Sequence, residues 1–467
     1  HLATALEHAD LVVEAIVENA DAKRGCSITV HLKDDMEEFS KISRIKAILE
    51  KYSNFVSFPI KLNDEHINKV EALWLKSKSE ITTEQYSEFY KFTAHAYDEP
   101  RYTMHFSADA PLAINALLFT PTENTEHFGM GQMEAGVALY CKKVLIEAKP
   151  EKLLPEWLCF LRGVIDSEDL PLNISREILQ QNRAVRAIRN RLTKKALETL
   201  VGLLGSDREA YVGFWGELGA VLKEGLLQEP EHKEAILKAS LFSSTTTDEL
   251  TTLAEYIERM PEGQDAIYYL AGEESSVVAN SPHLESFREK GYEVLLLSDR
   301  VDAIWGPMVT EFDGKPLRSV TASDADIRSD EQKKEAEEAR KKATQELGPM
   351  LESVREILDD HVGEVRLSDR LRSSPAVVVT PEGGMNAAME QVMRQMGQEV
   401  PPTKRILELN PEHAVVKRMA ALHTDEAAAE RFAGLARLVH GGALLAEGEL
   451  PPDPVAYQQL VAEVAGA

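Results

Sequence analysis

The segment from Ile165 to Arg183, IDSEDLPLNISREILQQNR, combines residue types that suit a phosphate-binding site. An acidic turn and a proline lead to Asn173 and Ser175, whose side-chain oxygens can accept hydrogen bonds from the unpaired amides at a helix start. Arg176 and Gln180 are four residues apart, so a helix projects both from one face, near a terminus that attracts anions. A guanidinium donates two aligned hydrogen bonds to phosphate oxygens. The spacing therefore predicts that Arg176 and Gln180 contact a phosphate.

The helix predicted from Arg176 to Lys195 is strongly basic, with Glu177 its one acid. Apolar residues recur on it at the spacing of one helical face, namely Ile178, Val185, Ile188, Leu192 and Ala196. The positive remainder has two interpretations. It is either a solvated face that answers acidic neighbours, or a surface for the phosphates of a nucleic acid.

Composition sets the broad class of the protein. A chain of 467 residues with 43% hydrophobic and 28% charged residues is typical of a soluble, folded protein of about two to four domains. The formal net charge of -26 disfavours nucleic acid and anionic membranes as partners. No long apolar run predicts a transmembrane helix, and the first residues lack the order of a signal peptide. We therefore expect a cytoplasmic protein.

Several familiar catalytic arrangements are missing from the sequence. It has no phosphate-binding P-loop, no complete dinucleotide fingerprint, no HExxH and no GxSxG. The three cysteines are widely spaced, and His95 and His105 are interpreted as ordinary sheet or surface residues, so no metal site is expected. An arginine without a nucleotide pocket can still act, because a separate domain can supply positive charge to a phosphoryl group during transfer.

A second group of residues with possible function is a methionine stripe. Four methionines and a valine fall on one face of a predicted helix, flanked by glycines on both sides. They are Met385, Met389, Val392, Met393 and Met396. Such a stripe either fills a core or forms an adaptable surface for unfolded chains, since flexible thioethers repack against many partners.

The hydrophobic pattern alternates between strands and helices and predicts an α/β fold. Helix is predicted up to about residue 52 and over 68–95, where Leu73, Trp74, Phe89, Tyr90 and Phe92 are the apolar anchors. A small parallel sheet with a crossover is predicted over 266–299. The remaining predictions are strands at 27–32, 102–107, 113–120, 137–148, 163–165 and 376–379, mainly helix over 194–260, a charged helix over 323–346, and closing helices at 425–445 and 454–464.

Four long segments closely resemble the ninety-kilodalton heat-shock chaperone family. They are LLPEWLCFLRGVIDSEDLPLNISREILQQNR (153–183), EALWLKSKSEITTEQYSEFYKF (71–92), YEVLLLSDRVDAIWGPMVTEFDGKPL (292–317) and RILELNPEHAVVKRM (405–419). The resemblance covers nearly all of residues 25–467. The chain ends in VAEVAGA, without the acidic Met-Glu-Glu-Val-Asp tail of eukaryotic cytosolic members, so it is similar to the bacterial type.

The resemblance implies an α/β (α+β) chain with a layered αβα middle domain followed by a mixed helical and sheet C-terminal dimerisation domain. Residues 1–24 do not match the family, and most of its nucleotide-binding domain is expected to be missing, through truncation or a chimeric reading frame. The implied divisions are 25–62 (closing strand and helix of the nucleotide-binding domain), 63–322 (middle domain, with a large unit to about 245 and a small unit to 322), 323–346 (charged linker helix) and 347–467 (C-terminal domain).

The family's functional residues carry over to matching positions. The resemblance implies that Arg176 reaches the γ-phosphate of ATP, with Gln180 beside it on the catalytic loop. It implies client contact at Trp74 and in the region from Trp305 to Met308. The stripe of Met385, Met389, Val392 and Met393 corresponds to the family's amphipathic client-binding helix, which favours the exposed interpretation.

The implied activity is ATP-driven clamping of a homodimer on partly folded client proteins, with the last two helices as the dimer interface. ATP and Mg²⁺ belong to the family's N-terminal domain, and we expect this chain alone to bind no cofactor. Two other interpretations are an ATP-independent client-binding scaffold and a nucleic-acid-binding protein that uses the helix from Arg176 to Lys195. A third, an oxidoreductase fragment, is suggested by the faint similarity of residues 5–24 to hydroxyacyl-CoA dehydrogenases, but a glycine-rich fingerprint is missing.

Overall fold

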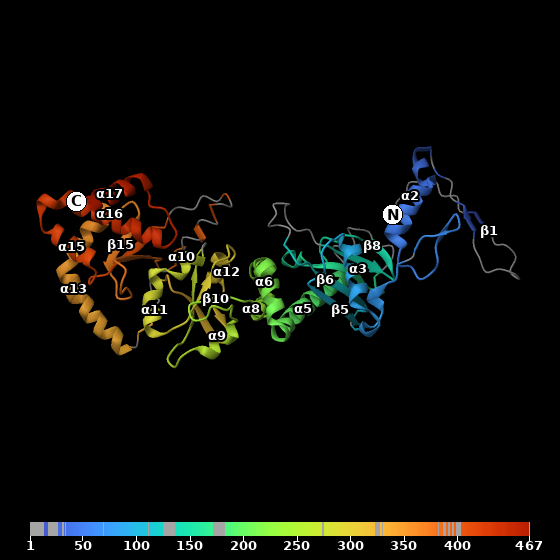
Figure 1. The fold of residues 1–467 in the computed structure, drawn as a ribbon, viewed down its shortest axis with the longest axis horizontal. Coiled ribbons are helices and arrows are strands. Elements are labelled where there is room, and N and C mark those ends of the chain that lie inside the picture. Colours follow the sequence, from blue (N-terminus) through green and yellow to red (C-terminus); the bar gives the residue numbers. More distant parts are fainter. Residues whose placement is uncertain are drawn as a thin grey trace. The chain divides into compact units, whose positions relative to one another are not determined.

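The computed structural model describes most of the chain. The described residues are 14–16, 27–29, 32, 34–68, 70–110, 112–124, 136–170, 183–272, 275–322, 327–328, 330–381, 383–385, 389–390, 393–394, 397 and 403–466. They divide into two compact units, residues 1–206 and 207–467, and each unit combines sheets with helices (Figure 1). The predicted α/β class is confirmed, while the family's domain boundaries stay a prediction.

The first unit begins with short elements. A pair of antiparallel strands is followed by a short 3-10 helix, a longer helix and a hairpin: β1 (Glu14–Ile16), β2 (Ser27–Thr29), η1 (Asp34–Ser40), α2 (Ile42–Ser53), β3 (Lys61–Leu62) and β4 (Glu65–His66). The helix predicted over 68–95 is divided into η2 (Leu73–Leu75), η3 (Lys78–Glu80) and α3 (Thr83–Ala94). The division has a local cause, because Ser77 and Thr82 each form a capping box that starts a new turn.

A five-stranded sheet forms the body of the first unit. Its strands are β5 (Tyr102–Ala108), β6 (Ile114–Thr120), β7 (Gly136–Cys141), β8 (Val144–Glu147) and β9 (Arg162–Asp166), in the order β5-β6-β9-β7-β8. The central strand β9 pairs antiparallel with β6 and parallel with β7. Gly163 in β9 has φ +126, and a Cβ there would lie 2.2 Å from the Leu117 carbonyl oxygen, so this close strand approach requires glycine.

The core of this unit is aromatic. Trp74, Phe89, Tyr90 and Phe119 are buried together with residues from β7 and β9. Phe92, predicted as an apolar anchor, is instead 49% exposed on α3. His105 lies in β5 as predicted, but it is buried, and its Nδ1 is 2.8 Å from the Tyr86 hydroxyl.

Helix α5 (Arg183–Ser206) confirms the predicted amphipathic pattern. Val185, Ile188, Leu192 and Ala196 are all buried, while Ile178 of the predicted stripe lies outside the described residues. On the polar side, Lys194 and Lys195 pair with Glu198. Part of the positive charge on the basic face is therefore paired with an acid on the same helix.

The second unit opens with a helical region and a small α/β layer. The helices are α6 (Arg208–Lys223), α7 (Gly225–Gln228), η6 (Pro230–His232), α8 (Lys233–Ala239) and α9 (Leu253–Arg259). The small sheet has the order β10-β12-β11-β14-β13, formed by β10 (Ser243–Ser244), β11 (Ile267–Ala271), β12 (Val294–Leu297), β13 (Glu311–Phe312) and β14 (Lys315–Ser319). Strand β11 is parallel to β12 and connects to it through α10 (Ser275–Ala279), η7 (Pro282–Leu284) and α11 (Glu285–Lys290), which confirms the predicted crossover. Helix α12 (Asp302–Met308) follows β12.

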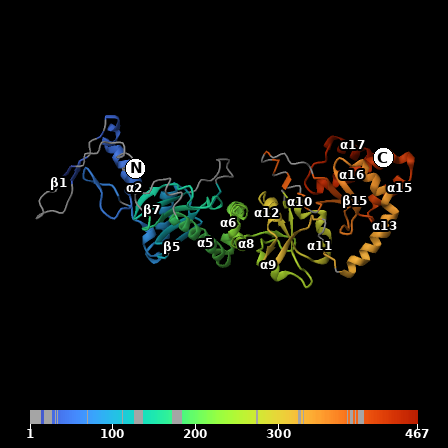
Figure 2. The same ribbon diagram turned by 180° about the vertical axis from the view of Figure 1, so that it is seen from behind.

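The C-terminal part places helices around a three-stranded sheet, as Figures 1 and 2 show around β15. The sheet has the order β15-β17-β16, formed by β15 (Val362–Leu367), β16 (Ala376–Val379) and β17 (Arg405–Leu409). The helices are α13 (Asp330–Ile357), α15 (Ala414–His423), η8 (Glu426–Ala428), α16 (Ala429–Ala446) and α17 (Pro454–Gly466). The charged helix predicted to 346 and a further helix predicted to about residue 358 form the single helix α13, whose last turns bury Met350 and Val354 in the C-terminal core. Within the described residues, no helix combines the length and apolarity needed to cross a bilayer.

Candidate functional site

The predicted phosphate contacts, Arg176 and Gln180, lie outside the described residues, in the interval 171–182. The structure describes the chain on both sides of this interval. Strand β9, at the centre of its sheet, leads to it, and α5 follows it. The frame around the predicted catalytic loop can therefore be built from its two ends.

Asp166 ends β9 and fixes the approach to the loop. Its carboxylate is 2% exposed and accepts hydrogen bonds from Trp74 Nε1 at 3.0 Å and from the Lys143 amide at 2.9 Å. Burial raises the pKa of Asp166, and the two hydrogen bonds oppose that rise. The end of β9 is thereby joined both to η2 and to the turn between β7 and β8.

The residues next to the interval are also held by the sheet. Cys141 at the end of β7 donates its thiol hydrogen to the Leu170 carbonyl oxygen at 2.9 Å, and burial raises the pKa of this thiol. The Asp169 carboxylate accepts a hydrogen bond from the Ala113 amide at 2.7 Å. Beyond the interval, Arg191 Nη1 donates to the Ala110 carbonyl oxygen at 2.7 Å. Both ends of the interval are thus fastened to the chain between β5 and β6.

Trp74, at which the resemblance implies client contact, lies inside the core in this conformation. The ring is fully buried, with its centroid 4.7 Å from that of Phe55, 5.3 Å from Tyr140 and 5.9 Å from Phe89. Its N–H group is bonded to Asp166, so neither its apolar face nor its polar edge requires a surface. The neighbouring surface is a hollow of about 550 Å³ lined by Leu75 and Lys143, among others.

The region from Trp305 to Met308 is divided between core and surface. Trp305 is fully buried, and its Nε1 donates to Asp302 Oδ1 at 2.7 Å. Met308, three residues later, is 58% exposed. Of the two side chains, Met308 alone offers a surface for contact in this conformation.

The methionine segment, residues 385–396, is held in place by contacts of one acidic residue, Glu390. Met385, Met389 and Met393 are partly buried, and Val392 lies outside the described residues. Glu390 is buried and accepts a hydrogen bond from the Thr403 amide at 3.1 Å, while Arg394 Nη2 pairs with it at 3.2 Å. The partial burial of the methionines fits neither a sealed core nor a free surface.

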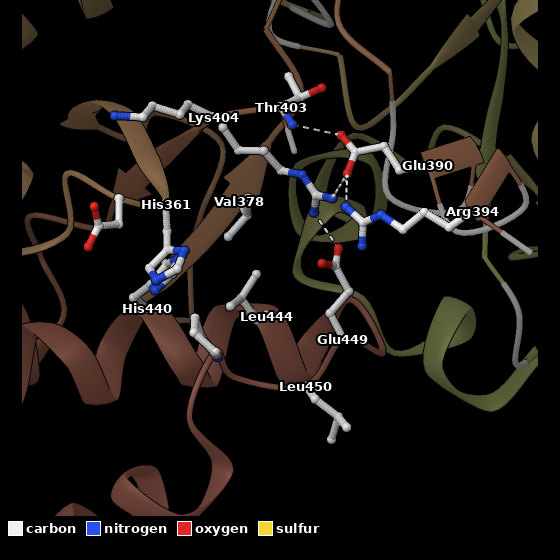
Figure 3. Close-up of a pocket in the computed structure, with 13 residues that line it drawn as sticks. His361, Val378, Glu390, Arg394, Thr403, Lys404, His440, Leu444, Glu449 and Leu450 are labelled. Carbon is white, nitrogen blue, oxygen red and sulfur yellow. Dashed lines mark hydrogen bonds and ion pairs between the residues drawn. The ribbon is translucent and has the colours of Figure 1, made fainter. Parts of the chain in front are cut away.

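A pocket of about 250 Å³ lies beside Glu390, which is one of its lining residues (Figure 3). Glu390 and Arg394 point toward one another on one side, the rings of His361 and His440 stack on the other, and Leu444 lies between (Figure 3). The stacked rings have centroids 6.2 Å apart and an interplanar angle of 18°. The pocket therefore has an apolar floor between a charged and an aromatic wall.

On the aromatic wall, His440 is electrically neutral near pH 7. Burial, followed by the nearby charges of His361 and Arg405, lowers the pKa of His440 to about 4. Arg405 on the charged wall lies between two acids, with its guanidinium 3.9 Å from Glu390 and paired with Glu449. In the described part of the chain, no group of three or more His, Cys, Asp or Glu side chains could hold a metal ion.

Asp166, Cys141 and Glu390 were not singled out by the sequence pattern. Asp166 stands within the segment 165–183 that was predicted to bind phosphate, but its partner Trp74 is 92 residues away. Glu390 is one acid among the 78 Asp and Glu residues of the chain. Local spacing contains no signal for such contacts, because each joins elements that meet only after folding.

Comparison with known proteins gives a consistent result. The family model described as Hsp90 protein matches residues 62–466. The chain is 42% identical over 468 residues to the chaperone protein HtpG of Mycolicibacterium gilvum, covering 95% of this chain and 72% of that protein. It is 43% identical over 474 residues to HtpG of Mycobacterium tuberculosis strain H37Rv, covering 95% and 73%, and 40% identical over 481 residues to HtpG of Mycobacterium leprae, covering 96% and 73%.

Proposed function

Because the chain belongs to the Hsp90 family, we propose that it is a molecular chaperone that binds partly folded client proteins. The observation that carries the proposal is the extent of the match, which runs from residue 62 to residue 466 and includes relatives named chaperone protein HtpG. The cytoplasm is the proposed location.

We further propose that clamping on clients is driven by ATP, with Arg176 and Gln180 completing the hydrolysis site. In this proposal ATP and Mg²⁺ are held by the family's nucleotide-binding domain. Arg176 would bind the γ-phosphate and stabilise the negative charge on its oxygens during transfer. The rigid base formed by Asp166, Cys141 and Leu170 supports this role, since a transition state is stabilised best by groups that are already in place.

Clients are proposed to bind at the methionine segment and at Met308. Partly buried thioethers beside a pocket with an apolar floor can adapt to many apolar sequences at low cost. The second proposed interface, between two copies of the chain, involves the C-terminal helices. Val455, Val461 and Val464 on α17 are exposed, and a homodimer would remove these apolar side chains from water.

Client binding is tested by the suppression of aggregation of a heat-denatured model enzyme. We expect the triple variant Met385→Ser, Met389→Ser, Met393→Ser to need several-fold more protein for the same suppression, because polar side chains lose the apolar contact. The matched control is Val201→Ser, which changes an exposed apolar residue on α5. Equal suppression by the triple variant and the control would remove the methionine segment from the proposal.

The role of Arg176 is tested by adding a separately expressed nucleotide-binding domain from an HtpG relative and measuring ATP hydrolysis. We expect Arg176→Ala to lower the hydrolysis rate by a factor on the order of 10³, the effect typical of losing such an arginine. The control is Arg186→Ala, which removes an exposed cation from α5. If wild type and Arg176→Ala stimulate hydrolysis equally while clients are still bound, the ATP-independent scaffold is the better description.

A further inference from the structure

The small sheet and the C-terminal sheet are joined through one carboxylate. Glu285, the first residue of α11, receives hydrogen bonds from three consecutive residues that precede β16. The backbone amides of Arg372, Ser373 and Ser374 all donate to it, the last two at 3.0 Å. The hydroxyls of Ser373 and Ser374 donate as well, at 2.8 and 2.6 Å.

This arrangement is an anion-binding nest occupied by an internal carboxylate. Successive backbone N–H groups that converge on one point create a local positive potential, and bonds to a charged acceptor are stronger than neutral ones. Burial acts to raise the pKa of Glu285, but the bonds from Ser374, Arg372 and Ser373 outweigh it and hold that pKa below its usual value. The residues 372–374 therefore favour a charged Glu285.

Other hydrogen bonds and ion pairs also cross this joint. Arg372 pairs with Glu289 at 2.6 Å, and Arg370 Nη1 donates to the Val320 carbonyl oxygen at 3.2 Å. Ser281 and His283 on the small-sheet side approach Glu447 at the end of α16.

The apolar cores of the two sides are separate. Among the described residues, the core cluster around Tyr268 and Phe287 shares no member with the cluster around Val354 and Leu407. Because each side keeps its own core, the joint can open without unfolding either core.

We propose that Glu285 and residues 372–374 form a releasable latch between the small sheet and the C-terminal sheet. Closed, the latch fixes the two sheets in the arrangement described above. Opened, it exposes the three amides and two hydroxyls of the nest and lets the C-terminal sheet change its orientation without unfolding. The device adds a regulated movement to the chain and does not depend on how clients or ATP are bound.

The latch is tested by hydrogen–deuterium exchange resolved to single amides in the full chain. We expect the amides of Arg372, Ser373 and Ser374 to exchange through local opening, at least about tenfold faster than those of Val377 and Val379 in the adjacent strand β16. Exchange of residues 372–374 only at the slow rate of the strand would show that the joint opens by global unfolding, and would overturn the proposal.

A variant pair separates the latch from ordinary surface pairing. Glu285→Gln removes the charge and presents an amide donor to a nest of donors, so exchange at residues 372–374 should rise about tenfold further while β15 and β17 are unchanged. Glu289→Gln is the control, since it removes the exposed pair with Arg372 and leaves the nest occupied. Equal exchange in the two variants would contradict the assigned role of Glu285.

Discussion

The small sheet of the second unit is fastened on two sides by ionic contacts that differ in their surroundings. Toward α6, Lys223 Nζ lies 2.6 Å from Asp302 Oδ1 and 2.6 Å from Asp299 Oδ2. Toward the C-terminal sheet, Glu285 occupies the nest of residues 372–374. Both joints are formed by charged groups and hydrogen bonds at similar distances. We therefore attribute the difference in the free energy needed to break them to their different exposure to water.

At the Lys223 joint, the Lys223–Asp302 pair is buried, whereas the Asp299 side chain is 42% exposed. Lys223 is 2% and Asp302 1% exposed, and the ammonium lies 5.7 Å from the centre of the Trp215 ring and 5.8 Å from that of Phe242. Burial raises the pKa of Asp302, and the charge of Lys223 acts against that rise. With little access to water, removal of the Lys223 charge leaves the buried Asp302 carboxylate without its cation.

The Glu285 joint is open to water at its edge, because Arg372 and Ser373 are exposed. Water can replace the partners of a separated carboxylate, so breaking this contact costs little. The comparison indicates that α6 and the small sheet form a permanent connection, whereas the connection to the C-terminal sheet can be released. Contacts of similar geometry thus hold one connection closed and allow the other to open.

The largest expected effect comes from Lys223→Met. The methionine fits the space of the lysine stem but leaves Asp302 buried without its cation, so we expect the free energy of unfolding to fall by about 3–5 kcal/mol. Urea denaturation followed by circular dichroism measures this change. Lys238→Met is the matched control, since Lys238 forms an exposed pair with Glu234 at the same 2.6 Å separation. Equal losses in the two variants would remove the distinction between sealed and solvated pairs.

A much smaller effect on global stability is expected from Glu285→Gln. Because this joint is partly solvated, the free energy of unfolding should change by less than about 1 kcal/mol, even though amide exchange at residues 372–374 rises. The same denaturation experiment measures it. A loss as large as that of Lys223→Met would mean that the joint belongs to the cooperative core and is no latch.

The smallest expected effect is the pH dependence of the stability difference between wild type and Glu285→Gln. The pKa of Glu285 is lowered in the folded protein from its ordinary 4.5, so its stabilising contribution is present above pH 4.5 and is lost as the pH falls through the folded pKa. Arg372 and Glu289 form a charged pair beside Glu285. The Glu289→Gln variant is measured as the reference, because it removes this pair and leaves Glu285 in place. The stability difference between wild type and Glu285→Gln should shrink as the pH is lowered below 4.5. A difference that grows in acid would contradict the assigned ionisation.

Much of the fold follows from local pattern. The buried stripe Val185, Ile188, Leu192 on α5 has the period of a helix, and the apolar run at Val294–Leu297 has the length of a buried strand. The pattern failed over 68–95, where two capping boxes divide the predicted helix, and at Phe92, whose apolar side chain faces solvent. Apolar character predicts burial well on average, but it does not say which face the neighbours will cover.

The candidate site was predicted less completely than the fold. The arginine segment and the methionine stripe could be proposed from the sequence because the chemistry of each is concentrated within about twenty residues. Client contact was predicted at Trp74 and Trp305, and in the structure each indole is buried and donates its N–H to an aspartate. Neither aspartate could be assigned beforehand, because a buried acceptor is recognised only when its donor and its enclosure are both known.

The sequence by itself determined the family and the α/β class, since these depend on long matches and on short-range periodicity. The tertiary structure alone decided which charges are sealed and which remain in water. Lys223 meets Asp302 across 79 residues, and Glu285 meets Ser374 across 89. The physical reason is that the strength of an ionic contact depends on its local dielectric environment, and that environment is created by chain segments distant in sequence.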